Sequence, residues 1–282
     1  MCGPAIPAQS PPRSPPAHSV AQRGCGSDAG FKVTWYRLVD HGVIRGLGRA
    51  IVEAALQSGA SVIATARDPK TLEGFSKSVG DTGFLALAVD VTNESDVINA
   101  INMGYKKFGR IDVLVNNAGY ADLASAIIPI FRQQGSGRIF QISSLGGRVA
   151  SPGLTAYQGT KWAVGGFSTG LAQEVAPFGI KVTVLEPGGI RTDWAGSSMN
   201  IPAISEPYQE TVGAFAEFLR DFSGKEPSLP EKIARIIIDL SEADDVPLRL
   251  LIGTDAVEYA AKAAEKLSIE DKKWYGVSVS SV

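Results

Sequence analysis

Short apolar runs alternate with helical stretches along this chain, and the alternation constrains the fold more than any other feature of the sequence. The apolar runs predict strands at residues 33–39, 61–65, 84–89, 111–115, 138–142, 181–185 and 249–252. Helical periodicity predicts helices at residues 49–58, 94–108, 157–176 and 256–267. Strands and helices in this order form parallel βαβ units. The sequence therefore predicts an α/β fold, in which helices cover both faces of a parallel sheet.

The first 30 residues are rich in proline and serine and carry little to bury. We expect them to form a disordered tail in front of one folded domain that spans residues 31–282. The tail holds no continuous apolar core, so no secretory signal is expected. No apolar run elsewhere reaches the roughly 18 residues of a transmembrane helix. A cytoplasmic location is therefore expected.

Charge, cysteine and histidine content exclude several classes of function. The net charge is −2 with no long basic run, so no nucleic-acid or membrane partner is expected. The two cysteines lie in the tail and cannot build a disulfide framework or a zinc site in the domain. With only His18 and His41 present, a histidine-dependent hydrolase or metal site is not expected. The stretch 166–170 spells the hydrolase motif G-x-S-x-G, but it falls inside a predicted helix.

A glycine-rich turn joins the first strand to the first helix and begins at Gly42, with Arg45, Gly46, Leu47 and Gly48 following. Glycine permits positive φ and close approach of a pyrophosphate, while the helix N-terminus supplies N–H donors. The turn therefore predicts a dinucleotide site, although a tight strand-to-helix connection without a ligand gives the same pattern.

Arg67 follows the second predicted strand, where a dinucleotide fold meets the adenosine ribose. An acid at this position would accept the 2′-hydroxyl of NAD, whereas a guanidinium suits a 2′-phosphate. Arg45 offers a second cation nearby. NADP(H) is therefore favoured over NAD(H), and two solvated surface arginines are the alternative.

Tyr157 and Lys161 lie four residues apart in a predicted helix and therefore on the same helical face. A free tyrosine has a pKa near 10, and a neighbouring ammonium favours its phenolate. Tyr157 can then give a proton to a carbonyl oxygen or take one back from an alcohol. Ser144 ends the preceding strand and could hydrogen-bond the same oxygen. Ser144, Tyr157 and Lys161 are thus the predicted catalytic residues.

From about Gly42 to Trp194 the sequence resembles the short-chain dehydrogenases/reductases. Besides the glycine turn and the Tyr157–Lys161 pair, three further family motifs resemble stretches of this chain: Asp90-Val91, Asn116-Asn117-Ala118-Gly119 and Pro187-Gly188-Gly189-Ile190-Arg191-Thr192. The resemblance implies a single-domain, doubly wound parallel sheet of the Rossmann type, with three α/β/α layers. It also implies hydride transfer between NADP(H) and a carbonyl/alcohol pair.

The resemblance also implies roles for individual residues. Ser144 would orient the substrate, Tyr157 would be the acid/base, and Lys161 would bind the nicotinamide ribose and lower the tyrosine pKa. The residues expected to contact the dinucleotide are Gly42, Arg45, Gly46, Leu47, Gly48, Arg67, Asp90, Val91, Asn116, Ala118, Gly119, Tyr157, Lys161, Pro187, Gly188, Ile190 and Thr192.

The chain departs from the family pattern in two places. Residues 1–41 look foreign to the fold: His41 replaces the family threonine, and Asp40 would be costly if buried unpaired in a central strand. Between Gly119 and Ile139 the chain lacks a helix and the start of a second one, which carries the family asparagine. The 23 residues from Asn116 to Arg138 still suffice for a parallel crossover, so we expect the sheet to close. We expect activity to be reduced or lost, and homo-oligomer formation stays open because a common interface helix is absent.

An apolar stripe marks the segment of about residues 194–228, which we call the lid segment. The stripe consists of Tyr208, Val212, Phe215, Leu219 and Phe222. The resemblance implies a cover over a small, lipophilic carbonyl or alcohol, but a helix packed on the core would give the same pattern. Glu186 and Asp193 flank the preceding strand end without a partner that the sequence identifies. The alternative function is a catalytically weak NADP(H)-binding sensor or partner subunit.

Overall fold

One seven-stranded parallel sheet runs through the computed structural model, which describes residues 34–38, 46–72, 74–75, 83–117, 122–194, 196 and 199–282. The strand order is β3-β2-β1-β4-β5-β6-β7, so the chain winds outward from the centre of the sheet in both directions. The strands are β1 (Thr34–Leu38), β2 (Ser61–Ala66), β3 (Phe84–Ala88), β4 (Val113–Asn116), β5 (Gly137–Ile142), β6 (Ile180–Pro187) and β7 (Arg249–Ile252). The predicted doubly wound α/β fold is confirmed.

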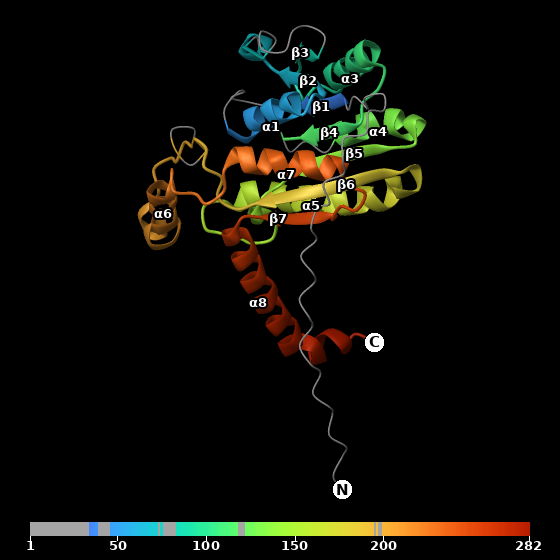
Figure 1. Cartoon of the computed structure of the whole chain (residues 1–282). Coiled ribbons are helices and arrows are strands. Elements are labelled where there is room, and N and C mark those ends of the chain that lie inside the picture. Colours follow the sequence, from blue (N-terminus) through green and yellow to red (C-terminus); the bar gives the residue numbers. More distant parts are fainter. Residues whose placement is uncertain are drawn as a thin grey trace. The chain divides into compact units, whose positions relative to one another are not determined.

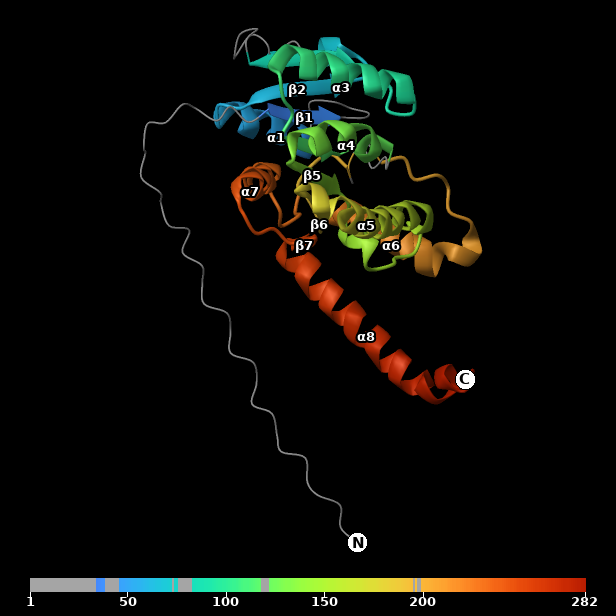
Figure 2. The ribbon, with the colours of Figure 1, turned by 90° about the vertical axis from the view of Figure 1, so that its right-hand side faces the viewer.

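Helices cover both faces of the sheet, as the end-on view shows (Figures 1 and 2). One face carries α1 (Gly46–Gln57) and α7 (Pro230–Glu242); the other carries α3 (Glu94–Phe108), α4 (Asp122–Gln134) and α5 (Thr155–Val175). Each face of the sheet packs against its helices in a separate hydrophobic core, and alternate strand residues belong to different cores. Val113 and Val115 pack with α1 and α7, whereas Leu114 packs with α3, α4 and α5. This two-residue period is that of an extended strand buried on both faces.

Two C-terminal helices differ from the sequence prediction. No separate helix is predicted at residues 230–242, yet Pro230 opens α7 and its buried residues Ile233, Ala234, Ile237 and Ile238 follow helical spacing. The predicted helix 256–267 is longer, because α8 spans Thr254–Val279. From residue 264 onward every residue is exposed. The second half of α8 therefore has no packing that an amphipathic pattern could reveal.

The short connection between β4 and β5 closes as expected. Helix α4 supplies the crossover, and Val113 of β4 lies opposite Arg138 of β5 in a parallel register. Strand β1 lies between β2 and β4, with Leu38 beside Thr65 on one side and Asn116 on the other. Residues 40 and 41, where the sequence departs from the family, lie outside the described residues.

The described residues all belong to one compact unit, Lys32–Val282. The expected N-terminal tail lies outside them. Within the described ranges, no helix is both long enough and apolar enough to cross a membrane.

Candidate active site

The carboxyl ends of neighbouring strands bring several predicted site residues to one edge of the sheet. β4 ends at Asn116, β5 leads directly into Ser143 and Ser144, and β6 ends at Pro187. Because β4, β5 and β6 are adjacent and parallel, these three ends lie side by side. Ligands of open α/β sheets bind beyond this edge.

Tyr157 and Lys161 project from the first two turns of α5. The Lys161 Nζ atom lies 5.7 Å from the centroid of the Tyr157 ring. The same Nζ atom donates a hydrogen bond to the carbonyl oxygen of Ile142, the last residue of β5, at 3.0 Å. The lysine is therefore held between the phenol and the end of the strand that carries Ser144.

Ser144 begins a tight turn, residues 144–148, which we call the serine turn. Its backbone is extended, and its Oγ atom accepts a hydrogen bond from the amide of Gly146 at 3.0 Å. The Ser144 hydroxyl also acts on the phenol of Tyr157 and lowers its pKa. A Cβ on Gly146 would come within 3.5 Å of the Tyr157 ring, so the turn lies against the tyrosine. Serine and phenol can thus meet one substrate oxygen.

Burial dominates the protonation of this pair. Burial raises the pKa of Tyr157, and the hydrogen bond with Ser144 partly offsets that rise by favouring the phenolate. Burial lowers the pKa of Lys161, because an ammonium is poorly solvated there. A phenol in such surroundings keeps its proton at neutral pH and can act as a proton donor.

Gly46, where the described part of the glycine turn begins, meets the turn after β6 at the N-terminus of α1. Gly46 has a φ of 62°, which favours glycine, and a Cβ there would lie 3.0 Å from Cγ2 of Thr192. A Cβ on Gly188 would overlap the carboxylate of Asp255, which accepts a hydrogen bond from the Gly189 amide at 2.7 Å. These close approaches bring the two glycine-containing turns into direct contact with neighbouring side chains, and we call the pair of turns the cradle.

Three further predicted cofactor residues, Arg67, Asp90 and Asn116, lie at or just after the carboxyl ends of β2, β3 and β4. Arg67 follows β2 directly and is exposed, while Asn116 is fully buried at the end of β4. Asp90 follows β3 and its Oδ1 atom accepts hydrogen bonds from the Thr92 amide and hydroxyl. The other cofactor candidates that the structure describes are Leu47, Gly48, Val91, Pro187 and Ile190, and those outside the described residues are Gly42, Arg45, Ala118 and Gly119.

Trp194, the first residue of the lid segment, is a site residue that the sequence did not place beside Tyr157. Its ring centroid lies 5.5 Å from that of Tyr157 with the planes inclined by 45°, and its side chain is 45% exposed. The Trp194 amide donates a hydrogen bond to Thr192 Oγ1 at 3.3 Å. The only signal in the sequence is an aromatic residue two positions after Thr192. Trp194 therefore presents an apolar surface next to the phenol.

The lid segment approaches the same place through η4 (Glu206–Tyr208), η5 (Gln209–Gly213) and α6 (Ala214–Phe222). A Cβ on Gly153, just before α5, would lie 3.0 Å from Val212. At its other end the segment joins the turn after β6, where Arg191 and Ser228 pair through their backbones. Of the predicted stripe, Tyr208 is exposed and Val212, Phe215, Leu219 and Phe222 are half-buried.

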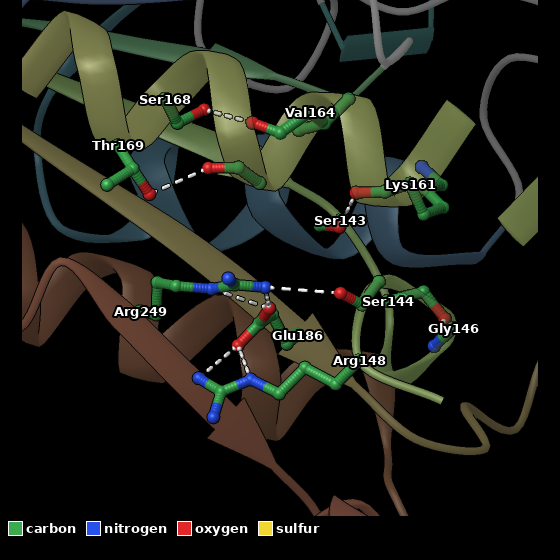
Figure 3. Close-up of polar contacts among 12 residues, drawn as sticks. Ser143, Ser144, Gly146, Arg148, Lys161, Val164, Ser168, Thr169, Glu186 and Arg249 are labelled. Atoms are coloured by element: carbon green, nitrogen blue, oxygen red, sulfur yellow. Dashed lines mark hydrogen bonds and ion pairs between the residues drawn. The ribbon is translucent and has the colours of Figure 1, made fainter. Parts of the chain in front are cut away.

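The G-x-S-x-G stretch lies within α5, as expected. The Ser168 side chain is fully buried, and its hydroxyl donates a hydrogen bond to the Val164 carbonyl at 2.7 Å (Figure 3). A serine turned back onto its own helix is not a nucleophile at a strand-to-helix turn. Among the residues that the structure describes, no cluster of histidine, cysteine or acidic side chains could hold a metal ion.

Comparison with known proteins agrees with this geometry. The pattern of the short chain dehydrogenase family matches residues 41–125 and, in a second overlapping stretch, residues 119–200. The chain belongs to the short-chain dehydrogenase/reductase family. The resemblance seen in the sequence is thereby confirmed. Oxidoreductase BOA17 of Botryotinia fuckeliana is 56% identical and covers 85% of this chain and 97% of its own length.

Solved structures are similar in fold. A short-chain dehydrogenase from Streptomyces avermitilis is 33% identical with a TM-score of 0.80, covering 89% of this chain and 99% of its own. ElxO, solved with NADP bound, is 24% identical with a TM-score of 0.66, covering 80% of this chain and 99% of its own. A 3-ketoacyl-(acyl-carrier-protein) reductase from Brucella melitensis, complexed with NADH, is 23% identical with a TM-score of 0.61, covering 79% and 96%. This chain is an oxidoreductase of that family with a Rossmann-type nucleotide-binding fold.

Proposed function

We propose that this chain transfers a hydride between NADP(H) and a small, lipophilic carbonyl/alcohol pair, with Tyr157 as the acid/base. One observation carries the proposal: Tyr157 lies beside both Lys161 and Ser144, at the carboxyl edge of the sheet, where ligands of open α/β sheets bind. Residues 31–282 would form the catalytic domain, and the lid segment would cover the substrate.

Each catalytic side chain has a defined task in this mechanism. Ser144 donates a hydrogen bond to the substrate oxygen and orients it beside the phenol. Tyr157 gives its proton to that oxygen during reduction and removes it during oxidation. Lys161 holds the ribose hydroxyls and favours the phenolate through its charge. When bound, the dinucleotide supplies or accepts the hydride.

The dinucleotide would lie along the edge from the glycine turn to Lys161. Gly42, Gly46, Leu47, Gly48, Ile190 and Thr192 would hold the phosphates and the nicotinamide end, with Asp90, Val91, Asn116, Ala118 and Gly119 lining the rest. Arg45 and Arg67 would take the 2′-phosphate. Since ElxO holds NADP and the Brucella reductase holds NADH, the fold admits both, and the preference for NADP(H) depends on the arginines.

The substrate preference is supported by the aromatic surface beside the phenol. Trp194 exposes nearly half of its side chain next to Tyr157, and Tyr208 of the lid segment is exposed as well. An apolar ketone that covers such rings removes them from water, which favours binding.

A catalytically weak NADP(H)-binding sensor or partner subunit is the second candidate. It is supported by the short connection after Gly119, where the two family matches meet at residues 119–125. The alignment with BOA17 runs over 265 positions, whereas 85% of 282 residues is about 240, so about 25 positions of that relative have no counterpart here. A shortened chain without the family asparagine would turn over slowly.

Fluorescence titration with NADPH, followed by a screen of small apolar ketones and aldehydes, tests the proposal and separates the two candidates. The enzyme predicts NADPH binding and NADPH oxidation that Tyr157→Phe abolishes. A sensor should bind NADPH but should show no NADPH oxidation that Tyr157→Phe abolishes. Failure to bind either NADPH or NADH would contradict both.

The cofactor preference needs its own variant. Arg67→Ala should weaken NADPH binding by roughly tenfold to a hundredfold, the range of a charge-assisted contact, and leave NADH binding unchanged. Lys70→Ala removes an exposed cation three residues away and is the matched control. Equal losses for both dinucleotides would refute the 2′-phosphate assignment.

A further inference from the structure

A buried carboxylate lies behind the serine turn. Glu186 of β6 has a fully buried side chain, and Figure 3 shows it between the guanidinium groups of Arg148 and Arg249. Arg148 Nε and Nη2 lie 2.7 and 2.6 Å from Oε2, and Arg249 Nε lies 3.0 Å from Oε1, which Arg249 Nη2 also contacts. Each oxygen of the Glu186 carboxylate is therefore paired with one guanidinium group, Oε2 with Arg148 and Oε1 with Arg249.

This ion-pair cluster of Glu186, Arg148 and Arg249 joins three elements around the active site. Arg148 closes the serine turn four residues after Ser144. Arg249 comes from β7, and its Nη2 atom also donates a hydrogen bond to the Gly147 carbonyl at 3.3 Å. Glu186 itself directly precedes Pro187, where the turn after β6 begins. The cluster thus connects the serine turn to the turn expected to hold the nicotinamide.

On its other side the serine turn lies against α5. Ser143 Oγ donates a hydrogen bond to the Lys161 carbonyl at 3.2 Å. A Cβ on Gly147 would lie 3.0 Å from that carbonyl oxygen and from Ser143 Oγ, so helix and turn are in direct contact. The turn is therefore held between the helix that carries Tyr157 and Lys161 and the ion-pair cluster.

Stability alone does not explain the cluster, because a buried ion pair is often no more stabilising than apolar residues of the same size. We propose that Glu186 is a positioning residue: through Arg148 and Arg249 it fixes the serine turn so that the Ser144 hydroxyl meets the substrate oxygen beside Tyr157. This inference rests on the proposed function, and it assigns a task to a carboxylate that the sequence left without a partner.

A double-mutant cycle with NADPH and benzil, an apolar aromatic diketone, tests the inference. Glu186→Gln removes the charge and keeps the shape of the side chain. It should lower kcat by roughly tenfold to a hundredfold, the cost of a displaced catalytic group, with the NADPH Kd changed by less than about twofold. Because Glu186 acts through Ser144, adding Ser144→Ala should cost much less in this variant than in the parent.

The matched control is Asp112→Asn, which breaks the ion pair of Arg110 and Asp112 at the amino end of β4, far from the serine turn in the sheet. It should leave kcat near the parent value, and its effect should add to that of Ser144→Ala. Additive losses for Glu186→Gln and Ser144→Ala, or equal kcat losses in the two ion-pair variants, would overturn the inference.

Amide hydrogen exchange of the fragment covering residues 143–149 decides the matter if the parent does not reduce benzil. Glu186→Gln should speed exchange in this fragment, and Asp112→Asn should not. Unchanged exchange in Glu186→Gln would overturn the positioning role. Faster exchange in Glu186→Gln, together with a parent that binds NADPH but reduces none of the screened carbonyl compounds, would keep the positioning role and remove the proposed reductase function.

Discussion

Two glycines at opposite ends of α1 allow the effect of a blocked cradle on NADPH binding to be separated from the effect of backbone strain on stability. Gly46 begins the helix with a φ of 62°, and Gly59 follows its end with a φ of 83°. Alanine at either position is forced into the left-handed region, which costs roughly 1–2 kcal/mol. At about 2–4 °C per kcal/mol for a domain of this size, each variant should lower Tm by roughly 2–8 °C.

The two substitutions differ in what the new methyl group meets. At Gly59 nothing lies within 4 Å, whereas at Gly46 the methyl would lie 3.0 Å from Thr192 Cγ2 and would occupy the turn. Gly46→Ala should therefore weaken NADPH binding by about tenfold, or about 1.4 kcal/mol, and Gly59→Ala should not.

Thermal unfolding followed by circular dichroism and NADPH titration by fluorescence measure both effects on the same samples. A lower Tm in both variants, with NADPH binding weakened only in Gly46→Ala, is the expected pattern. If Gly46→Ala binds NADPH as tightly as the parent, the glycine turn does not hold the pyrophosphate and the cradle is wrongly placed.

Three further predictions concern the acid/base pair, the aromatic surface and the core. Ser144→Ala removes a hydroxyl that lowers the pKa of Tyr157, so that pKa rises. Because Tyr157 must be deprotonated to act as the base, the rise of kcat/KM for alcohol oxidation with pH should move to higher pH; an unmoved rise would argue against the contact. Trp194→Ala should raise KM for benzil by roughly threefold to tenfold, because it removes an aromatic contact of about 0.5–1.5 kcal/mol. Trp194→Phe should retain most of the affinity. Equal effects of the two variants would mean that the Trp194 ring does not contact the substrate. Gly137→Ala places a methyl group 2.2 Å from the fully buried Phe131 ring. It should lower the free energy of unfolding in urea by roughly 1–3 kcal/mol without changing the NADPH Kd. An unchanged free energy of unfolding would mean that Phe131 of α4 does not pack against β5.

The sequence identified those parts of the site that depend on local geometry. Tyr157 and Lys161 meet because residues four apart share a helical face, and Ser144 follows a strand whose apolar pattern is plain. Strand and helix positions followed from the same local periodicity, although α7 passed unnoticed despite its buried isoleucines.

Contacts between distant parts of the chain could not be predicted in this way. Glu186 lies 38 positions from Arg148 and 63 from Arg249 in sequence, and only the order of β5, β6 and β7 brings the three together. The contact of Trp194 with Tyr157 likewise depends on the path of the turn after β6, for which no periodicity exists. The second half of α8 was missed for the opposite reason, since an exposed helix has no buried face to predict it.

A crystal structure of this protein with NADPH bound tests the central claim most directly. We expect the pyrophosphate at Gly46, the 2′-phosphate at Arg67 and the ribose hydroxyls within hydrogen-bond distance of Lys161 Nζ, with the nicotinamide ring beside the Tyr157 hydroxyl. A dinucleotide bound elsewhere, or a Tyr157 hydroxyl that points away from the nicotinamide ring, would contradict it.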